Sequence, residues 1–202
     1  MMLDYEREAL AAGYGRIAGI DEVGRGPLAG PVVTACVMLP LEEALLIEGI
    51  TDSKKLSPKK RAALEEKILE RGQWALGMVD EKRIDRINIL NATKEAMVQA
   101  ALGLDPLPDM VLVDAVKNLD LPMAQKAIIK GDLNSYLIGA ASIVAKEARD
   151  RMMKEYDKLY PGYGFAKNMG YGTAEHIAAL KTLGPCPIHR ASFLTKILGG
   201  NP

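Results

Sequence analysis

Four acidic residues end or follow short apolar runs of the kind that form strands: Asp21, Glu22, Asp114 and Asp132. A strand with a carboxylate at its end holds that group on a rigid element, as a metal ligand requires. Carboxylate oxygens suit Mg²⁺ or Mn²⁺, and a set without cysteine or histidine does not suit zinc. Each acid also has an ordinary alternative. Asp-Glu after a strand is usually a solvated turn, and Asp132 could be the N-cap of a helix.

A glycine-flanked arginine follows the first two acids directly, as Gly24, Arg25 and Gly26. Neighbouring residues of a strand point to opposite faces, so Asp21 and Glu22 can serve one metal centre only if the chain leaves strand geometry there. Glycine makes such a departure easy and leaves the backbone open to close approach by a ligand. We therefore expect the chain to leave the strand at the acids.

The elements that must position these acids are strands and helices in alternation. Apolar runs rich in β-branched residues predict strands at about 16–21, 31–39, 73–79, 110–113 and 125–129. The spacing of apolar residues predicts helices over 3–12, 58–71, 84–102, 133–160 and 174–183, and Ser57-Pro58 is a helix-start signal. We expect strands early and helices later, in an order close to βββαβαβα.

Composition limits the classes of protein that the chain can be. With 202 residues, 49% of them hydrophobic, it can form one domain with a sizeable core. Lys and Arg together number 26, and so do Asp and Glu. The chain therefore lacks the excess of basic residues that usually marks a nucleic-acid-binding protein. Cys36 and Cys186 make no disulfide framework, and the chain shows neither an apolar run of membrane-span length nor a secretory core. We expect a reduced, cytoplasmic protein without membrane association.

The acids lie in motifs that match a known family in order along nearly the whole chain. The run GIDEVGRGPLAGPVV closely resembles the opening motif of bacterial ribonuclease HII. The similarity continues, from about Ile17 to Phe193, through TDSKKLSPKKR, LVDAVKNL, GDLNSYLIGAASIVAKEARDR, YPGYGFAKNMGYGT and GPCPIHRASF. That family of type 2 ribonucleases H cleaves the RNA strand of RNA–DNA hybrids and incises duplex DNA 5′ to embedded ribonucleotides. The resemblance implies the same endonuclease activity and substrates here.

The resemblance also implies an architecture, the α/β ribonuclease H-like fold, with a mixed five-stranded sheet flanked by helices. Residues 1–160 would form the catalytic domain. Residues 161–202, where the chain becomes rich in glycine and tyrosine, would form a C-terminal helical and loop segment. This segment would complete the substrate groove within the same compact unit, and we expect a monomer.

On this resemblance, the four acids match the acidic quartet of the family residue for residue. They would be both catalytic residues and ligands of two divalent ions, Mg²⁺ or Mn²⁺, in two-metal phosphodiester hydrolysis. Asp21 would bridge the ions. Glu22 and Asp114 would serve the side of the leaving group, with Asp132 near the attacking water. Because four carboxylates at one place repel one another, at least one pKa should be raised when metal is absent.

Seven further residues are candidates for binding the substrate: Gly24, Arg25, Gly26, Lys54, Ser142, Lys146 and Tyr171. Gly24-Arg25-Gly26 resembles the family's motif for reading the 2′-hydroxyl, the group that distinguishes RNA from DNA at one position. Tyr171 matches the family tyrosine that packs on the next deoxyribose and tests for an RNA-to-DNA junction. Lys54, Ser142 and Lys146 are candidates for phosphate contacts.

Some of these candidates have structural alternatives. Tyr171 could be a loop tyrosine packed on the domain, and Lys54 belongs to a basic run of the kind that is ordinarily solvated. We assign His176 and His189 structural roles, since a metal-activated water needs no histidine. The chain departs from the family pattern, with less positive charge near the groove, at Leu133, Asn134, Asn168 and Met169.

Two other functions stay open on the sequence alone. One is another nuclease or recombinase-like enzyme of the same broad fold, against which the Gly-Arg-Gly motif and Tyr171 argue. The other is a non-catalytic nucleic-acid-binding module, which the acids argue against because carboxylates without metal would repel phosphates. The preferred metal, the rate, and the balance between single ribonucleotides and long hybrids do not follow from the sequence.

Overall fold

A mixed five-stranded sheet is the centre of the computed structural model, which describes residues 2–199. Its strands lie in the order β3-β2-β1-β4-β5. They are β1 (Ile17–Val23), β2 (Val32–Met38), β3 (Gln73–Val79), β4 (Met110–Asp114) and β5 (Ala124–Ile128). Strands β1, β2 and β3 pair antiparallel, whereas β1, β4 and β5 pair parallel. The expected mixed sheet is therefore confirmed.

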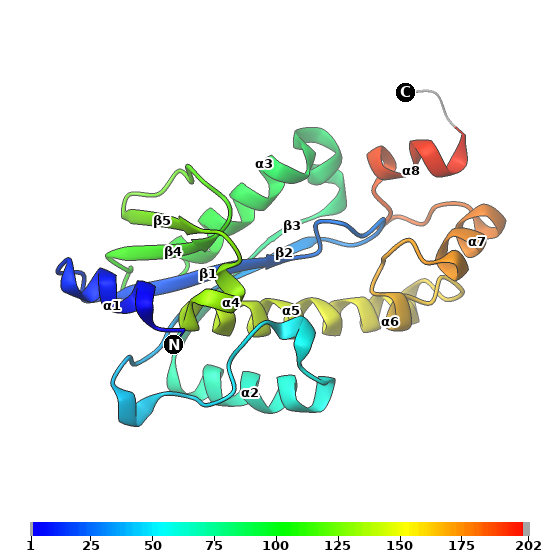
Figure 1. Cartoon of the computed structure of the whole chain (residues 1–202). Coiled ribbons are helices and arrows are strands. Elements are labelled where there is room, and N and C mark those ends of the chain that lie inside the picture. The colour runs from blue at the N-terminus through cyan, green and yellow to red at the C-terminus, as the bar shows by residue number, and fades with distance from the viewer. Residues whose placement is uncertain (1, 200–202) are drawn as a thin grey trace.

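Helices cover both faces of this sheet. Helix α3 (Glu81–Leu102) lies on one face, while α5 (Tyr136–Leu159) lies on the other with α2 (Pro58–Arg71) packed beside it (Figure 1). The remaining helices are α1 (Asp4–Ala11), α4 (Gly131–Asn134), α6 (Phe165–Asn168), α7 (Ala174–Leu183) and α8 (Ala191–Leu198), with short 3₁₀ turns at Glu43–Leu45 and Ser53–Lys55. In the part of the chain that the structure describes, no helix is long and apolar enough to cross a membrane.

The three central strands, β1, β2 and β4, are largely apolar on both faces because each face is covered. Alternate residues of β1, β2 and β4 enter two separate cores, as strand geometry requires. Ala35 and Val37 pack in the core with α5, whereas Cys36 between them packs in the core with α3. Helix α5 approaches the sheet very closely at Gly19, where an added Cβ would lie 2.2 Å from the carbonyl carbon of Leu137.

Two expectations about the order of elements are wrong. Helix α2 separates β2 from β3 and no helix separates β4 from β5, so the order is not close to βββαβαβα. The single helix expected over 133–160 is two helices, because Ser135 adopts extended backbone angles between α4 and α5. The Ser135 hydroxyl caps α5 by accepting a hydrogen bond from the Ile138 amide at 3.2 Å. The cap of that helix is thus not Asp132.

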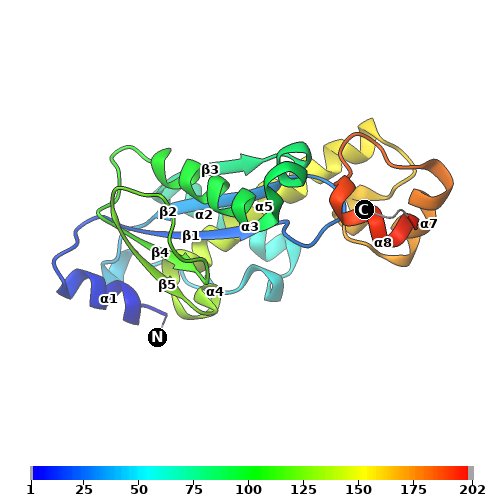
Figure 2. The same ribbon diagram turned by 90° about the horizontal axis from the view of Figure 1, so that it is seen from above.

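The C-terminal helices α6, α7 and α8 gather beyond the loop between β1 and β2, at the opposite end of the molecule from α1 (Figure 2). Their core includes Met153 of α5 together with Phe165 and Ile188. Asp85 of α3 accepts hydrogen bonds from the amides of Ala191 and Ser192, which are the first residues of α8. This segment therefore contacts elements from both faces of the sheet.

Candidate active site

The parallel strands β1 and β4 bring three of the predicted acids together. Ile20 pairs with Val113, so the next residues, Asp21 and Asp114, are neighbours across the two strands. Alternation places both on the face of the sheet that α5 covers. Each of Asp21, Glu22 and Asp114 offers a carboxylate oxygen within 4.8 Å of the others. This cluster of oxygen donors has the chemistry of a divalent-cation site.

Glu22 reaches this cluster without the departure from strand geometry that we expected. Both Asp21 and Glu22 stay in β1 and pair with Ala35 and Thr34 of β2. Strand β4 ends at Asp114, so no residue of that strand lies opposite Glu22, and its long side chain can reach the same centre. The chain leaves the strand only after Val23, at Gly24, whose φ is +91°.

Burial makes these carboxylates hard to ionise in the absence of metal. The pKa of Asp21, which is 5% exposed, is raised well above its usual value by burial and then by the charges of Glu22 and Asp114. Burial also raises the pKa of Glu22 and of Asp114. One Glu22 oxygen, Oε2, is buried without a hydrogen-bond partner among the described residues. A bound cation would satisfy that oxygen and reverse the repulsion, so the residues present fit a divalent ion.

Asp132 lies beside the cluster rather than in it. It sits in the first turn of α4, half-buried, and its charge contributes to the raised pKa of Asp114. Helix α4 is tied to β4 because the Gly131 amide donates to Asp114 Oδ1 at 2.7 Å. The structure thus brings three of the four predicted acids together and leaves the fourth adjacent.

The Gly-Arg-Gly loop borders the acids. Arg25 Nη1 donates to Glu22 Oε1 at 3.1 Å, and this guanidinium opposes the rise in the Glu22 pKa. Gly24 must be glycine, because an added Cβ would lie 2.3 Å from Nε of Arg149 and the positive φ disfavours other residues. A Cβ at Gly26 would lie 3.6 Å from the Tyr171 ring, which is 44% exposed. Tyr171 therefore faces the loop and is not packed into the domain.

The three candidates for phosphate contacts differ in environment. Lys54 is exposed, and its charge lowers the pKa of Asp114. Lys146 Nζ donates to Asp150 at 2.6 Å. Ser142 is buried, lies 2.9 Å from the Ser53 hydroxyl, and its hydrogen bond to Asp21 opposes the rise in that pKa. Ser142 thus contacts one carboxylate of the acidic cluster.

Two residues at the site have roles that the sequence analysis did not assign to them. Arg149 falls in an ordinary charged stretch of α5, yet it is buried and binds loop carbonyls. Asn168, a departure from the family pattern, holds the turn before Tyr171: its Nδ2 donates to the Tyr163 carbonyl, and its Oδ1 accepts from the Gly170 amide. The one sequence feature that could have indicated a role for Arg149 is its place on the apolar face of a helix, where a charged residue is unusual.

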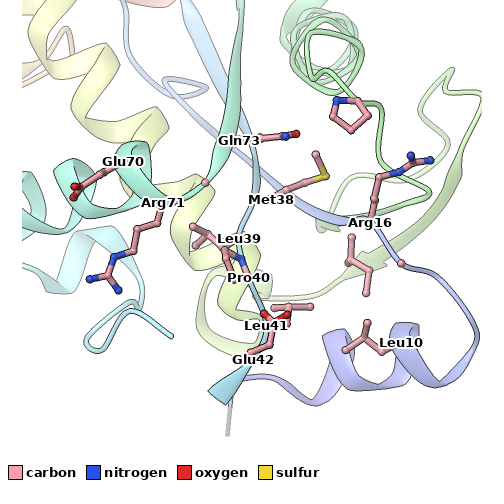
Figure 3. Close-up of a pocket in the computed structure, with 14 residues that line it drawn as sticks. Leu10, Arg16, Met38, Leu39, Pro40, Leu41, Glu42, Glu70, Arg71 and Gln73 are labelled. Atoms are coloured by element: carbon pink, nitrogen blue, oxygen red, sulfur yellow. The ribbon is translucent and has the colours of Figure 1, made fainter. Parts of the chain in front are cut away.

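A pocket of about 600 Å³ lies elsewhere, at the opposite end of the sheet (Figure 3). Its walls come from the start of β1, the end of β2 and the start of β3, and they include Arg16, Met38 and Gln73. The acids lie at the far end of β1, so none of the predicted site residues lines this pocket.

The chain is similar to known proteins over nearly its whole length. Residues 18–196 match the family model described as ribonuclease HII. Ribonuclease HII of Acetivibrio thermocellus is 54% identical over 95% of this chain and 75% of that protein. The crystal structure of ribonuclease H2 from Pyrococcus horikoshii OT3 aligns with a TM-score of 0.76 and 27% identity over 92% of this chain and 98% of that one. Bst-RNase HIII in complex with Mn²⁺ has the same fold, at 19% identity and a TM-score of 0.63 over 91% of this chain and 64% of that one.

Proposed function

Because this chain belongs to the ribonuclease HII family and is a metal-dependent endonuclease, we propose that Asp21, Glu22 and Asp114 hold its divalent ions. With them it cleaves the RNA strand of RNA–DNA hybrids and incises duplex DNA 5′ to embedded ribonucleotides. The observation that carries this proposal is the partly buried cluster of three carboxylates, in which Asp21 is buried and Glu22 and Asp114 are half-buried. Their raised pKa values, and a Glu22 oxygen that has no hydrogen-bond partner among the described residues, favour a bound cation.

Two ions, Mg²⁺ or Mn²⁺, are proposed to share the site. When bound, such ions activate a water molecule for attack on phosphorus and stabilise the charge that develops on the departing oxygen. Asp21 would bridge them, Glu22 and Asp114 would hold the side of the leaving group, and Asp132 would complete the site from α4. The structure of Bst-RNase HIII, which has the same fold, contains Mn²⁺ and supports a divalent metal here.

Recognition of RNA is proposed to lie in the loop next to the acids. The 2′-hydroxyl is the group that separates a ribonucleotide from a deoxyribonucleotide, so it must be read close to the scissile bond. Gly24, Arg25 and Gly26 border the acids, and Tyr171 offers an exposed ring beside Gly26 on which a deoxyribose could pack. Lys54 is the best placed of the phosphate candidates because it is exposed and close enough to act on Asp114, with Lys146 and Ser142 further ones.

One assay tests this function. A duplex that contains a single ribonucleotide should be incised on its 5′ side with Mg²⁺ or Mn²⁺, and not with chelator. An all-DNA duplex of the same sequence should stay intact, which separates this enzyme from other nucleases of the fold. Metal-independent binding without any incision would instead favour a binding module and overturn the proposal.

We further propose that the protein acts as a monomer in the cytoplasm, with residues 161–202 completing the groove made by residues 1–160. In support, Arg149 of α5 donates to the Met169 carbonyl, and Asp85 accepts from the start of α8. Light scattering after size exclusion at micromolar concentration should give the mass of one chain.

A further inference from the structure

Two arginines beside the Gly-Arg-Gly loop are buried, and among the described residues they donate hydrogen bonds only to backbone carbonyl groups. Arg190 is fully buried and Arg149 is 1% exposed, and neither donates a hydrogen bond to a carboxylate within residues 2–199. A buried charge without an acid is costly unless its donors are satisfied. Here six backbone carbonyls satisfy them, all from the two loops that border the site or the residues next to them.

Arg190 fixes the Gly-Arg-Gly loop. Its Nη2 donates to the Gly24 carbonyl at 2.6 Å, and its Nη1 donates to the Arg25 carbonyl at 3.0 Å. Its Nε and Nη2 also donate to the Gly30 carbonyl, at 2.9 and 2.7 Å. Both ends of the loop are therefore held by one guanidinium, whose Cζ atom lies over the ring of Phe193, 5.1 Å from the ring centroid.

Arg149 ties this loop to the one that carries Tyr171. It donates to the carbonyls of Ala29 and Pro31 at 3.0 and 2.9 Å, and to that of Met169 at 2.9 Å. The Leu28 amide adds a direct bond between the loops, to the Gly170 carbonyl at 2.8 Å. The distance between Gly26 and the Tyr171 ring is thus set by buried contacts.

The direction of these bonds has a consequence for the backbone amides. In a trans peptide, the C=O of one residue and the N–H of the next point in opposite directions. Because Arg190 draws the Gly24 and Arg25 carbonyls inward, the N–H groups of Arg25 and Gly26 point outward, on the two exposed residues of the loop. Neither amide donates a hydrogen bond to any acceptor in the described part of the chain.

We propose that Arg190 and Arg149 are positioning residues for ribonucleotide selection. Arg190 turns two adjacent N–H groups toward the sugar, where they donate to the 2′-hydroxyl oxygen, and Arg149 sets the position of the Tyr171 ring against them. Neither arginine touches the substrate. This inference rests on the function proposed above and deepens it.

The test compares affinity for ribonucleotide and deoxyribonucleotide on the active, metal-loaded enzyme. KM is measured for a duplex with one ribonucleotide, and Ki for an all-DNA duplex of the same sequence as competitor. Arg190→Lys keeps the positive charge but lacks the planar guanidinium with its several N–H donors. In this variant we expect the ratio Ki/KM to fall at least ~10-fold because KM rises, since the 2′-hydroxyl loses its oriented N–H donors. Ki should stay within about twofold, since phosphate contacts do not change.

A matched control separates this effect from a loss of stability. Ile68→Ala removes a buried side chain of α2 from a core that includes no residue of either loop. It should lower the melting temperature by an amount comparable to Arg190→Lys and leave Ki/KM unchanged. A ratio that is retained in Arg190→Lys, or lost equally in Ile68→Ala, would overturn the inference. Failure of the wild-type enzyme to incise the ribonucleotide duplex would instead overturn the proposed function.

A second measurement needs no variant and decides the matter if Arg190→Lys does not fold. In the free wild-type protein, the amides of Arg25 and Gly26 should exchange hydrogen within about tenfold of unstructured rates. The amides of Leu28 and Gly30 are the internal control, because they donate to the Gly170 and Ile188 carbonyls and should be protected. Protected Arg25 and Gly26 amides would show that they already have partners, which contradicts the proposal.

Discussion

At the scale of single residues, the three clustered carboxylates oppose folding unless a cation joins them. The charged form of Asp21 is the least favourable of the three, because this residue is almost fully buried beside two other acids. A group whose pKa is raised in the folded state contributes stability at low pH and loses it as pH rises through that pKa. Near neutral pH without metal, Asp21 is therefore a destabilising residue that is kept for its chemistry.

Asp21→Asn should abolish incision and leave the protein folded. The amide keeps the shape but removes one buried charge, so the metal-free free energy of unfolding at pH 7 should be equal to the wild-type value or higher by about 1 kcal/mol or more. Urea unfolding in chelator and the incision assay measure the two effects. Full activity of this variant with metal present would rule out the assignment of Asp21.

Tyr171 should contribute to selection and little to folding, since its ring is 44% exposed. Tyr171→Ala should reduce the preference for a single embedded ribonucleotide over a continuous RNA–DNA hybrid by about tenfold, the loss of one stacked contact. Tyr171→Phe keeps the ring and should keep the preference. Competition between the two duplexes measures it, and an unchanged preference in Tyr171→Ala would count against this role.

Two histidines hold the backbone of Tyr171 through a chain of hydrogen bonds that requires both to be neutral. His176 Nδ1 donates to the Tyr171 carbonyl at 2.8 Å, so its Nε2 must accept from His189 Nε2 at 3.0 Å. His189 Nδ1 then accepts from the Cys186 amide at 2.9 Å. A proton added to either ring would set two N–H groups against each other. The structural role expected for these histidines has this physical form.

Because these hydrogen bonds require both histidines to be neutral, we expect the protein to lose stability in mild acid. Burial lowers the pKa of His189 to about 4, below its unfolded value of about 6.5. Its contribution to stability is full above pH 6.5 and is lost as pH falls toward about 4, up to roughly 3 kcal/mol. Urea unfolding between pH 7 and pH 4 should show that the free energy of unfolding falls less steeply with pH in His189→Phe than in the wild type. Parallel pH profiles would contradict the account, and comparison with the wild type cancels the opposite contribution of the clustered acids.

At the scale of elements, helix α1 supports the start of α5, next to the helix that carries Asp132. Glu6 of α1 is fully buried, and its Oε1 accepts from the Ser135 hydroxyl at 2.6 Å and from the Leu137 amide at 3.0 Å. A carboxylate at a helix N-terminus satisfies free amides and complements the helix dipole. The first helix of the chain thus stabilises the break at Ser135 that gives α4 its separate direction.

Glu6→Ala should lower the free energy of unfolding by about 2 kcal/mol, because a buried amide and hydroxyl lose their acceptor. Glu8→Ala, on the same helix, removes only an exposed ion pair with Lys126 and should cost about 0.5 kcal/mol or less. Urea titrations of the two variants make the comparison. Equal effects would show that Glu6 does not support α5.

At the scale of the whole molecule, charge is separated in space although the formal net charge is zero. Acids converge at the ends of β1 and β4, whereas Arg149 and Arg190 lie behind the adjoining loops and donate hydrogen bonds to no carboxylate in the described chain. The absence of a basic excess therefore does not argue against a nucleic-acid substrate, because the fields that matter are local.

Metal binding should stabilise the whole fold. An ion that binds only the native state at one hundred times its Kd adds about 2.7 kcal/mol, or roughly 5–10 °C in Tm for a chain of this size. Mg²⁺ and Mn²⁺ should raise Tm, and chelator should reverse the rise. Asp21→Asn should lose the shift, whereas Glu70→Gln, on the distant pocket wall, should keep it. A shift that persists in Asp21→Asn would place the metal elsewhere.

The sequence alone determined the strands, most helices and the acids at the strand ends. These features depend on local patterns: the apolar run before Asp21, the run before Asp114, and the cap and proline at Ser57 and Pro58. The order of family motifs along the chain then predicted the mixed sheet, because motifs in that order imply one topology.

Only the tertiary structure decided what lies together. Glu22 joins Asp21 because β4 ends where it does, and Asp132 lies beside the cluster in the short helix α4, which Ser135 separates from α5. Arg149 and Arg190 are far apart in sequence and have no local pattern that marks them as partners of Gly24 or Met169. Which carbonyl a buried guanidinium meets, and how far burial moves a pKa, depend on packing across the whole fold, which local periodicity does not contain.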